Sequence, residues 1–408
     1  MDLDSILKSF LPEIIRLRRQ IHSAPELPWQ ETQTQLTVEA FLKNHGYETR
    51  RVAGTGLIAD LSGTAVAGTR PRTLAIRADL DALPVQEDTG LDFASKTPGV
   101  MHACGHDVHA AVVAGLAAVM ARIRDDLPGR VRFMFQPAEE GGSSRTPGVD
   151  PFKTIPVSRR GAERMMDDGA LDGVDAIVGA HTWPELPVGA VGVDPKTAMA
   201  GNATLRIRIK GRGGHGAMPH RAIDPVPVAA SLVLALQTIA SRRSNPANPF
   251  VLTIGSLHAG TAASIIPETA ELMATLRSSA PGYLDKEIPE VLRKMVHGIV
   301  EGAGAQVDMA YAPGLPPSVN DAALVDAFLA SASRTLGRQN AILLDEVSMT
   351  SEDFAYYAEA VPAVYVKVGV AGKDGSAPLH NPHFNPDERS IEVAIRVLAG
   401  FALDFLRS

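Results

Sequence analysis

The chain contains very little cysteine, and this scarcity excludes one class of fold. Cys104 is the single cysteine among 408 residues, so no disulfide can form within the chain. Small secreted proteins that depend on disulfides for their stability are therefore excluded. Apolar residues make up 45% of the chain, which provides for an ordinary hydrophobic core, and the length suits two domains.

An excess of basic residues is also missing. The 39 Lys and Arg residues are outnumbered by 46 Asp and Glu residues, which gives a formal net charge of −7. Nucleic acids and anionic membranes are usually bound through basic patches. The charge balance therefore argues against both kinds of partner.

Long apolar runs and a signal peptide are absent as well. No uncharged apolar run reaches the roughly 18 residues that a membrane span needs. The first 28 residues open with acidic side chains, and their apolar positions recur at helical spacing, interrupted by Glu13, Arg16 and Arg18. This pattern predicts an amphipathic helix. We therefore expect a cytoplasmic protein that does not associate with membranes.

The outer parts of the chain alternate between predicted strands and helices. Strands are predicted at 73–83, 129–142 and 175–183, with helices at 106–126 and 161–171. Such alternation is typical of a mostly parallel α/β sheet with helices on both faces. Ligands of such sheets bind beyond the carboxyl ends of the strands.

The middle of the chain has a different rhythm, β-α-β-β-α-β. The predicted strands are 204–214, 249–260, 268–279 and 306–313, and the predicted helices are 224–243 and 281–304. Asp224 is the expected N-cap of the first helix and Pro225 its first residue. This order is ferredoxin-like. We therefore predict an α+β lid domain at 194–314, inserted into an α/β metal-binding domain formed by 1–193 plus 315–408.

The densest group of chemically active side chains lies in segment 102–109, HACGHDVH. A lone His at a helix start more often serves as a cap, but here five groups that can bind a metal or a proton fall within eight residues. Cys104 and His106 lie where the helix begins, and the helix dipole there lowers the pKa of a thiol. A thiolate is a good metal ligand, so this segment predicts metal binding.

Further candidates follow the predicted strands. Glu139 and Glu140 come directly after an apolar strand, so one can ligate a metal while the other accepts a proton from water. His181 ends another predicted strand, and His380 follows a third, with His383 as its local competitor. Each residue alone is more often structural. Strand ends in one sheet lie close together, however, so these side chains can meet around metal ions.

Two residues of the predicted lid complete the candidate site. His215 lies in a Gly-rich turn after a strand, and Arg277 lies near the end of another strand. A solvated Arg is the ordinary interpretation. The functional interpretation is that Arg277 binds a substrate carboxylate through two hydrogen bonds, while His215 donates to the carbonyl oxygen under attack.

Eight motifs resemble one enzyme family along almost the whole chain. They are LRRQIHSAPEL, IRADLDALPVQE, MHACGHDVHAA, FQPAEEGG, GAHTWPELPVG, GGHGAMPH, TSEDFAYY and LHNPHFNPDE. In this order they resemble the amidohydrolase branch of the co-catalytic metallopeptidases, which includes hippurate hydrolases, N-acyl-amino-acid amidohydrolases and plant auxin-conjugate hydrolases.

The resemblance implies a fold, a reaction and a ligand set. It implies a metal-binding α/β domain with a lid that also forms a homodimer, and hydrolysis of the amide bond of N-acyl or N-aroyl amino acids. Glu139 matches the family's general base, and Asp79 matches an orienting residue. His215 matches a residue that reaches the active site, including that of a partner subunit. Arg277 matches a residue that contacts the substrate carboxylate. The implied ligands of two divalent ions, Zn²⁺ or Mn²⁺ with Co²⁺ and Ni²⁺ as alternatives, are Cys104, His106, Glu140, His181 and His380.

Two departures from the family pattern concern the substrate rather than the reaction. Ser264 stands where relatives often carry Asn, and residues 143–160 look like an insertion after the PAEEGG motif that forms a long loop. Two alternative functions remain: a dipeptidase or carboxypeptidase acting on short peptides, and a non-catalytic protein that binds amino acids or peptides.

Overall fold

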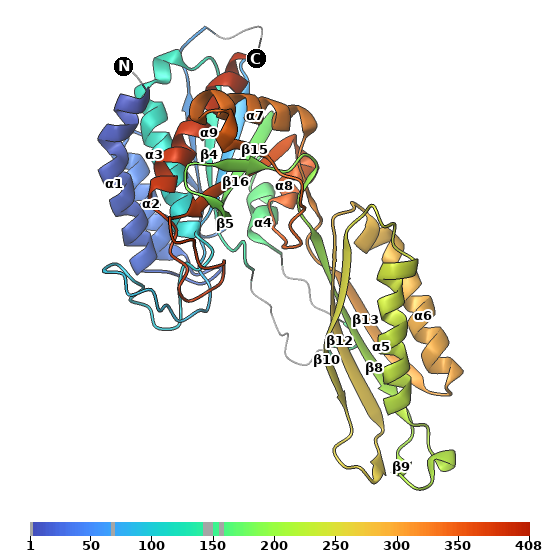
Figure 1. Ribbon diagram of the computed structural model, residues 1–408. Coiled ribbons are helices and arrows are strands. Elements are labelled where there is room, and N and C mark those ends of the chain that lie inside the picture. The colour runs from blue at the N-terminus through green and yellow to red at the C-terminus, as the bar shows by residue number, and fades with distance from the viewer. Residues whose placement is uncertain (1–2, 67–69, 142–149, 155–158) are drawn as a thin grey trace.

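Two separate β-sheets, each with its own hydrophobic core, form the protein (Figure 1). The computed structural model describes residues 3–66, 70–141, 150–154 and 159–408. Most of the loop predicted at 143–160 therefore lies outside the described residues.

The larger sheet is mixed. Its eight strands, in spatial order, are β1 (Thr49–Val52), β2 (Gly56–Ser62), β4 (Arg130–Gln136), β3 (Thr73–Asp79), β5 (Ala176–Pro187), β16 (Ala363–Ala371), β6 (Val191–Val193) and β15 (Ala341–Leu343). The central neighbours β4, β3, β5 and β16 are parallel, as are β6 and β15, whereas the β1–β2, β2–β4 and β16–β6 pairs are antiparallel. The predicted mixed, mostly parallel sheet is confirmed.

Helices cover both faces of this sheet. One face is covered by α1 (Leu3–Ser23), α2 (Thr32–Asn44), α3 (His106–Arg122), α7 (Ala322–Leu336) and α9 (Arg389–Arg407), and the other by α4 (Gly161–Asp167) and α8 (Ala355–Ala360). Because strand side chains alternate between faces, Leu74 and Ile76 belong to the core under α3, whereas Ala75 belongs to the core under α8. Burial on both faces explains why β3 is apolar almost throughout.

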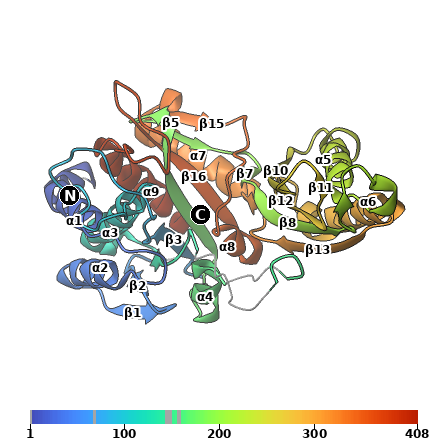
Figure 2. The same ribbon diagram turned by 90° about the horizontal axis from the view of Figure 1, so that it is seen from below.

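The second sheet has the predicted ferredoxin-like order. Its elements, in chain order, are β8 (Gly201–Lys210), α5 (Pro225–Arg242), β10 (Phe250–Ala259), β12 (Thr269–Ser278), α6 (Ile288–Gly302) and β13 (Gln306–Pro313). The strands lie in the order β10-β12-β8-β13, and all neighbours are antiparallel. In Figures 1 and 2 both helices lie on one face of this sheet, beside the larger body. The predicted fold class is confirmed, whereas the domain boundaries at 193/194 and 314/315 remain predictions.

Short strands and turns complete the described chain. The strands are β7 (Thr197–Met199) paired with β14 (Ser318–Val319), and β9 (Gly214–His215) paired with β11 (Ile265–Ile266). The 3₁₀ turns are Arg124–Asp126, Pro219–Arg221 and Arg338–Asn340.

Some element ends differ from the sequence prediction. The strand predicted at 175–183 continues to Pro187, because its register with β16 extends that far. The helix predicted at 281–304 begins as a π-helix at Tyr283–Glu287, and α6 starts afresh at Ile288. Pro289 occupies the first turn of α6, where its missing N–H costs no hydrogen bond.

α5 is one helix that is long and apolar enough, by length and composition alone, to cross a membrane, although only 33% of its residues are buried. A single such helix is a weak indication, because core helices pass the same test. The buried face of α5, which includes Leu232, Leu236 and Ile239, packs in the core of the second sheet.

Candidate metal centre

Parallel strand ends bring distant segments to one edge of the larger sheet. Asp79 is the last residue of β3, and Glu139 and Glu140 follow the end of β4. His181 lies within the neighbouring β5, and His380 follows β16. Because these strands are parallel, their carboxyl ends lie together, as predicted.

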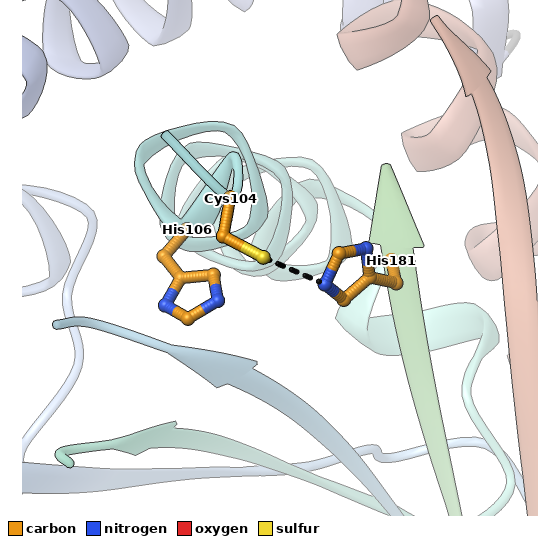
Figure 3. A group of neighbouring side chains, drawn as sticks. All are labelled: Cys104, His106 and His181. Carbon is orange, nitrogen blue, oxygen red and sulfur yellow. Dashed lines mark hydrogen bonds between the residues drawn. The ribbon is translucent and has the colours of Figure 1, made fainter. Parts of the chain in front are cut away.

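The five predicted metal ligands form two groups that share one sulfur atom. Sγ of Cys104 lies 3.4 Å from Nε2 of His181, toward which it points in Figure 3. Nε2 of His380 lies 3.1 Å from Oε1 of Glu140. The donor atoms of Cys104, His106 and His181 lie within 4.8 Å of one another, and so do those of Cys104, Glu140 and His380. This geometry would allow the sulfur of Cys104 to contact ions in both groups.

The two buried histidines of the ligand set, His106 and His181, are each oriented by a hydrogen bond at Nδ1. Nδ1 of His106 donates to the backbone carbonyl of Asp81 at 2.9 Å, and Nδ1 of His181 donates to the carbonyl of Thr182 at 2.7 Å. Such bonds leave Nε2 unprotonated and available to a metal. Nε2 of His106 is buried and has no hydrogen-bond partner among the described residues. This orphaned nitrogen, beside a thiol and a carboxylate, fits a divalent cation.

Asp81 holds three parts of the centre together, and sequence reasoning missed it. Its Oδ1 lies 3.3 Å from Nδ1 of His106 and accepts the N–H of Glu139 at 3.1 Å, while Oδ2 accepts the N–H of Glu140 at 3.0 Å. The side chain is 1% exposed. The sequence offered one indication of its role, because Asp81 lies two residues after Asp79 in the motif IRADLDALPVQE.

Asp79 orients the layer of side chains behind the ligands. Its Oδ1 accepts from Nδ1 of His109 at 2.6 Å, and its Oδ2 accepts from Arg77 at 2.6 Å. Nε2 of His109 in turn accepts the N–H of Thr182, next to His181. This placement suits the predicted orienting role, which remains a prediction.

Glycine is required between the first two ligands. Gly105 has φ +86°, in the left-handed region, and caps the N-terminus of α3. A Cβ at this position would lie 2.4 Å from Oγ1 of Thr182. A side chain here would therefore push Cys104 and His106 away from the strand that carries His181.

Glu139 lies beside the ligands in a buried acidic group. It is 6% exposed, and the N–H of Asp353 donates to its Oε1 at 3.3 Å. Burial raises the pKa of Glu139 well above its ordinary value, and the nearby Glu352 and Glu140 carboxylates raise it further. A carboxyl with a raised pKa in a cavity is suited to proton transfer.

Glu352 is a second residue that sequence reasoning missed, although the TSEDFAYY motif contains it. It accepts a hydrogen bond from Arg77 at 2.9 Å and from the Tyr365 hydroxyl at 2.5 Å, and it is 2% exposed. Burial acts to raise the pKa of Glu352, but Arg77, His181 and the Tyr365 hydroxyl together outweigh this effect and lower it. The carboxylate therefore stays charged beside Glu139.

The thiol pKa differs from the sequence prediction. The helix dipole was expected to lower the pKa of Cys104, but burial raises it, and the Glu140 carboxylate adds to this effect. Desolvation wins because the side chain is only 7% exposed. A thiolate at this position therefore needs a cation beside it.

A cavity of about 460 Å³ opens over the centre. It is lined by Cys104, Glu139, Glu140, Arg160, His181, Met199, Asn202, Arg277, Leu315, Met349, Thr350, Ser351, Glu352, Leu379 and His380. Arg277 thus reaches the cavity as predicted, although it belongs to β12 of the second sheet. Burial lowers the pKa of its guanidinium, which donates to Oγ1 of Thr275 at 2.8 Å.

Three residues singled out in the sequence lie away from this cavity. His215 is exposed on β9, at the end of the second sheet remote from the larger body (Figure 1). The exposed Ser264 lies at the same end, where its carbonyl accepts the N–H of Gly216. His383 donates to the carbonyl of Asp88 rather than facing the ligands, so the geometry favours His380 over its competitor.

Comparisons with known proteins identify relatives of this chain. Residues 75–404 match the model of peptidase family M20/M25/M40. An N-acetylcysteine deacetylase of Bacillus subtilis is 37% identical over 403 residues, which cover 98% of this chain and 99% of the relative. An N-acyl-L-amino acid amidohydrolase of Geobacillus stearothermophilus is 40% identical over 309 residues, 76% of this chain and 78% of the relative. The crystal structure of a dinuclear metal-binding M20 peptidase of Bacillus subtilis superposes with a TM-score of 0.80 at 35% identity, and covers 98% of this chain and 99% of its own.

Proposed function

The chain belongs to peptidase family M20/M25/M40 and is a metal-dependent amidohydrolase, and on this premise we propose how its residues cleave the amide bond of an N-acyl amino acid. The products are a carboxylic acid and a free amino acid. One observation carries the proposal: Cys104, His106, Glu140, His181 and His380 gather around one cavity, with Glu139 beside them.

Two metal ions occupy this kind of centre, in keeping with the two donor groups and the dinuclear relative. We assign them to Zn²⁺ or Mn²⁺, because sulfur, nitrogen and oxygen donors together suit such ions. When bound, the ions supply Lewis acidity, which lowers the pKa of water and polarises the substrate carbonyl. The residues that would hold the ions are Cys104, His106, Glu140, His181 and His380.

Glu139 is the proposed general base. Its carboxylate accepts a proton from the attacking water, and the resulting hydroxide adds to the amide carbon. The C–N bond then breaks, and the protonated carboxyl returns the proton to the leaving amine. Burial beside Glu352 and Glu140 raises the pKa of Glu139, which favours its holding the proton between the two steps.

Substrate binding is assigned to the second sheet. Arg277 pairs with the free carboxylate of the amino acid, since its guanidinium faces the cavity and matches a carboxylate with two N–H donors. His215 is too far along the second sheet to act in its own chain. We therefore propose that the protein forms a homodimer through residues 194–314. In this dimer His215 donates to the reacting carbonyl oxygen in the cavity of the other protomer. We place the enzyme in the cytoplasm.

Substitution of Glu139 by Gln tests the role of the base. The amide keeps the shape of the side chain but cannot accept the proton, so we expect kcat to fall at least about 10²-fold. Elemental analysis should still find two metal ions per chain. The measurements are hydrolysis of N-acetyl-L-amino acids and metal content in the same samples, with the exposed Glu185→Gln as a matched control.

Near-wild-type turnover by Glu139→Gln would remove that residue from the mechanism. Removal of the metals by a chelator should abolish hydrolysis, and return of Zn²⁺ or Mn²⁺ should restore it. Faster cleavage of dipeptides than of N-acyl amino acids would instead favour the peptidase alternative.

A further inference from the structure

Arg160 is a cationic side chain in the catalytic cavity that the proposed reaction does not use. It lies directly before α4 and lines the same cavity as Glu139 and Arg277. Its Nη1 donates to the backbone carbonyl of Glu139 at 2.8 Å. The guanidinium is therefore fixed against the segment that carries the general base.

A glycine makes room for this guanidinium. A Cβ at Gly141 would lie 2.2 Å from Nη1 and 2.6 Å from Cζ of Arg160. Gly141 also has φ +61°, a conformation that side chains rarely adopt. The close approach of Arg160 to the backbone after Glu140 thus depends on glycine at this position.

Most of the N–H donors of Arg160 are unused by the described part of the chain. A guanidinium has five N–H donors, and within residues 3–66, 70–141, 150–154 and 159–408 the Arg160 side chain donates only to Glu139 and pairs with no carboxylate. The neighbouring Arg159, by contrast, pairs with Asp167. Arg277 also lacks a carboxylate partner among the described residues.

Two guanidinium groups that lack carboxylate partners within the described part of the chain therefore line one cavity. Arg277 accounts for one carboxylate, the one that every N-acyl amino acid carries. The carboxylates of Glu139, Glu140 and Glu352 also line this cavity, but none of them forms an ion pair with Arg160, so a second carboxylate of the substrate would be the direct anionic partner that this guanidinium lacks among the described residues.

We propose that Arg160 binds a second carboxylate of the substrate, so that the enzyme prefers N-acyl amino acids with two carboxylates over those with one. This inference rests on the proposed function. The second carboxylate belongs either to the acyl group or to the side chain of the amino acid, and both offer the planar anion that a guanidinium fork matches. Arg160 ends the stretch 143–160, which we predict from the sequence to be an insertion after the PAEEGG motif, so we expect the preference to be a property of this chain's own sequence.

Matched substrate pairs test the proposal in the metal-loaded enzyme. N-acetyl-L-glutamate is compared with N-acetyl-L-glutamine, and N-succinyl-L-alanine with N-butyryl-L-alanine. The ratio of kcat/KM within each pair reports the value of the second charge. The ratio is taken as the value for the compound with two carboxylates divided by the value for the compound with one. In wild type we expect it to exceed one for the pair whose second carboxylate can reach Arg160, on either the amino-acid side chain or the acyl group. In R160Q we expect this ratio to be at least about tenfold lower.

Two further variants separate charge recognition from support of the loop. R160K keeps the charge without the planar fork, so its ratio should fall between those of wild type and R160Q. Arg159→Gln is the matched control, because Arg159 is adjacent but does not line the cavity, and it should keep the wild-type ratio.

A ratio of one or less for both pairs in wild type, or an unchanged ratio in R160Q, would overturn the proposal while leaving amide hydrolysis intact. If R160Q does not turn over, calorimetric titration of N-acetyl-L-glutamate into E139Q and E139Q/R160Q supplies the comparison. At least tenfold weaker binding by the double variant supports the proposal, and equal binding refutes it. Failure of wild type to hydrolyse any of the four compounds would count against the proposed function, and the titration would still decide the role of Arg160.

Discussion

At the scale of single residues, the metal centre depends on a backbone conformation that few side chains tolerate. Gly105 stands between two proposed ligands at φ +86°, with Thr182 in the space where a Cβ would lie. Ala at this position adds both conformational strain and a steric clash. Strain of this kind costs about 1–3 kcal/mol, and the clash displaces the thiol and imidazole from His181.

We therefore predict that Gly105→Ala lowers both the melting temperature and the metal content. The measurements are thermal unfolding and elemental analysis of the purified protein. Gly90→Ala is the matched control, because Gly90 also has a positive φ of +69° but nothing within 4 Å of its Cβ position. Equal losses in the two variants would mean that strain alone, and not contact with Thr182, is responsible.

A second prediction for a single residue concerns Glu87, whose carboxyl makes the free energy of unfolding depend on pH. Burial would raise the pKa of this carboxyl, but hydrogen bonds from His22, Thr89 and the N–H of Ser95 outweigh it and lower the pKa to about 2. The ordinary value is 4.5, so between these values the folded state binds fewer protons than the unfolded state. The contribution to stability is therefore complete above pH 4.5 and is lost as the pH falls toward 2.

The lowered pKa of Glu87 predicts how the stability of Glu87→Gln depends on pH. The variant should be less stable than wild type at pH 7 by about 1–3 kcal/mol, the value of hydrogen bonds to a charged group, and the difference should shrink at pH 3. Urea unfolding at both pH values measures it, with the exposed Glu48→Gln as control. A difference that stays constant between pH 7 and pH 3 would contradict the assignment.

At the scale of elements, helix and strand ends carry most of the function. The parallel strands β4, β5 and β16 deliver three ligands and the base to one edge, their neighbour β3 delivers Asp79, and the N-terminus of α3 delivers two more ligands. The second sheet uses the same local chemistry for stability. Asp224 caps α5 by accepting the N–H of Val226 at 3.0 Å, and Pro225 begins the helix, as the sequence predicts.

Removal of this cap should weaken the second sheet. We expect Asp224→Ala to cost about 0.5–2 kcal/mol, since the first-turn N–H groups lose their acceptor, whereas Asp224→Ser should retain most of the stability. Chemical unfolding followed by circular dichroism measures both variants. If Asp224→Ala and Asp224→Ser lost the same amount of stability, the Asp224 side chain would not act as a helix cap.

At the scale of the whole molecule, two sheets with separate hydrophobic cores are joined in one chain. The residues of the larger sheet's core and those of the second sheet's core form separate clusters, and the proposed metal ligands belong to the larger body. Arg208 of β8 links the second sheet to the segment after PAEEGG, through an ion pair with Asp150 at 2.8 Å and a cation–π contact with Phe152.

This organisation predicts two unfolding transitions in calorimetry. Metal ions bind the folded larger body, so excess Zn²⁺ or Mn²⁺ should raise the transition of that body, by about 2.7 kcal/mol at 100 times the dissociation constant. The transition of the ferredoxin-like unit should move little. A single transition that shifts as a whole would mean that the two parts unfold as one, against the predicted division at 193/194 and 314/315.

Much of this protein is determined by local sequence. The pattern of apolar residues predicts β10, β12 and β13 to within one residue of their ends and β8 to within four, because side-chain periodicity depends on contiguous residues. The ligand types are similarly local: Cys104, His106, Glu139 and Glu140 carry their chemistry in two short motifs, and the order of motifs indicates the family. The identity of the reaction could therefore be inferred before any coordinates.

Only the tertiary structure decided which side chains meet. Sheet order places β3, β4, β5 and β16 side by side, and so brings Asp81 under Glu139 and Glu352 beside it, contacts that no spacing along the chain encodes. The same packing raises the pKa of Cys104, where the helix dipole alone predicted the opposite. It also leaves His215 outside the cavity and brings Arg160 into it. Long-range contacts and burial depend on how the elements pack together, and local residue patterns do not determine that packing.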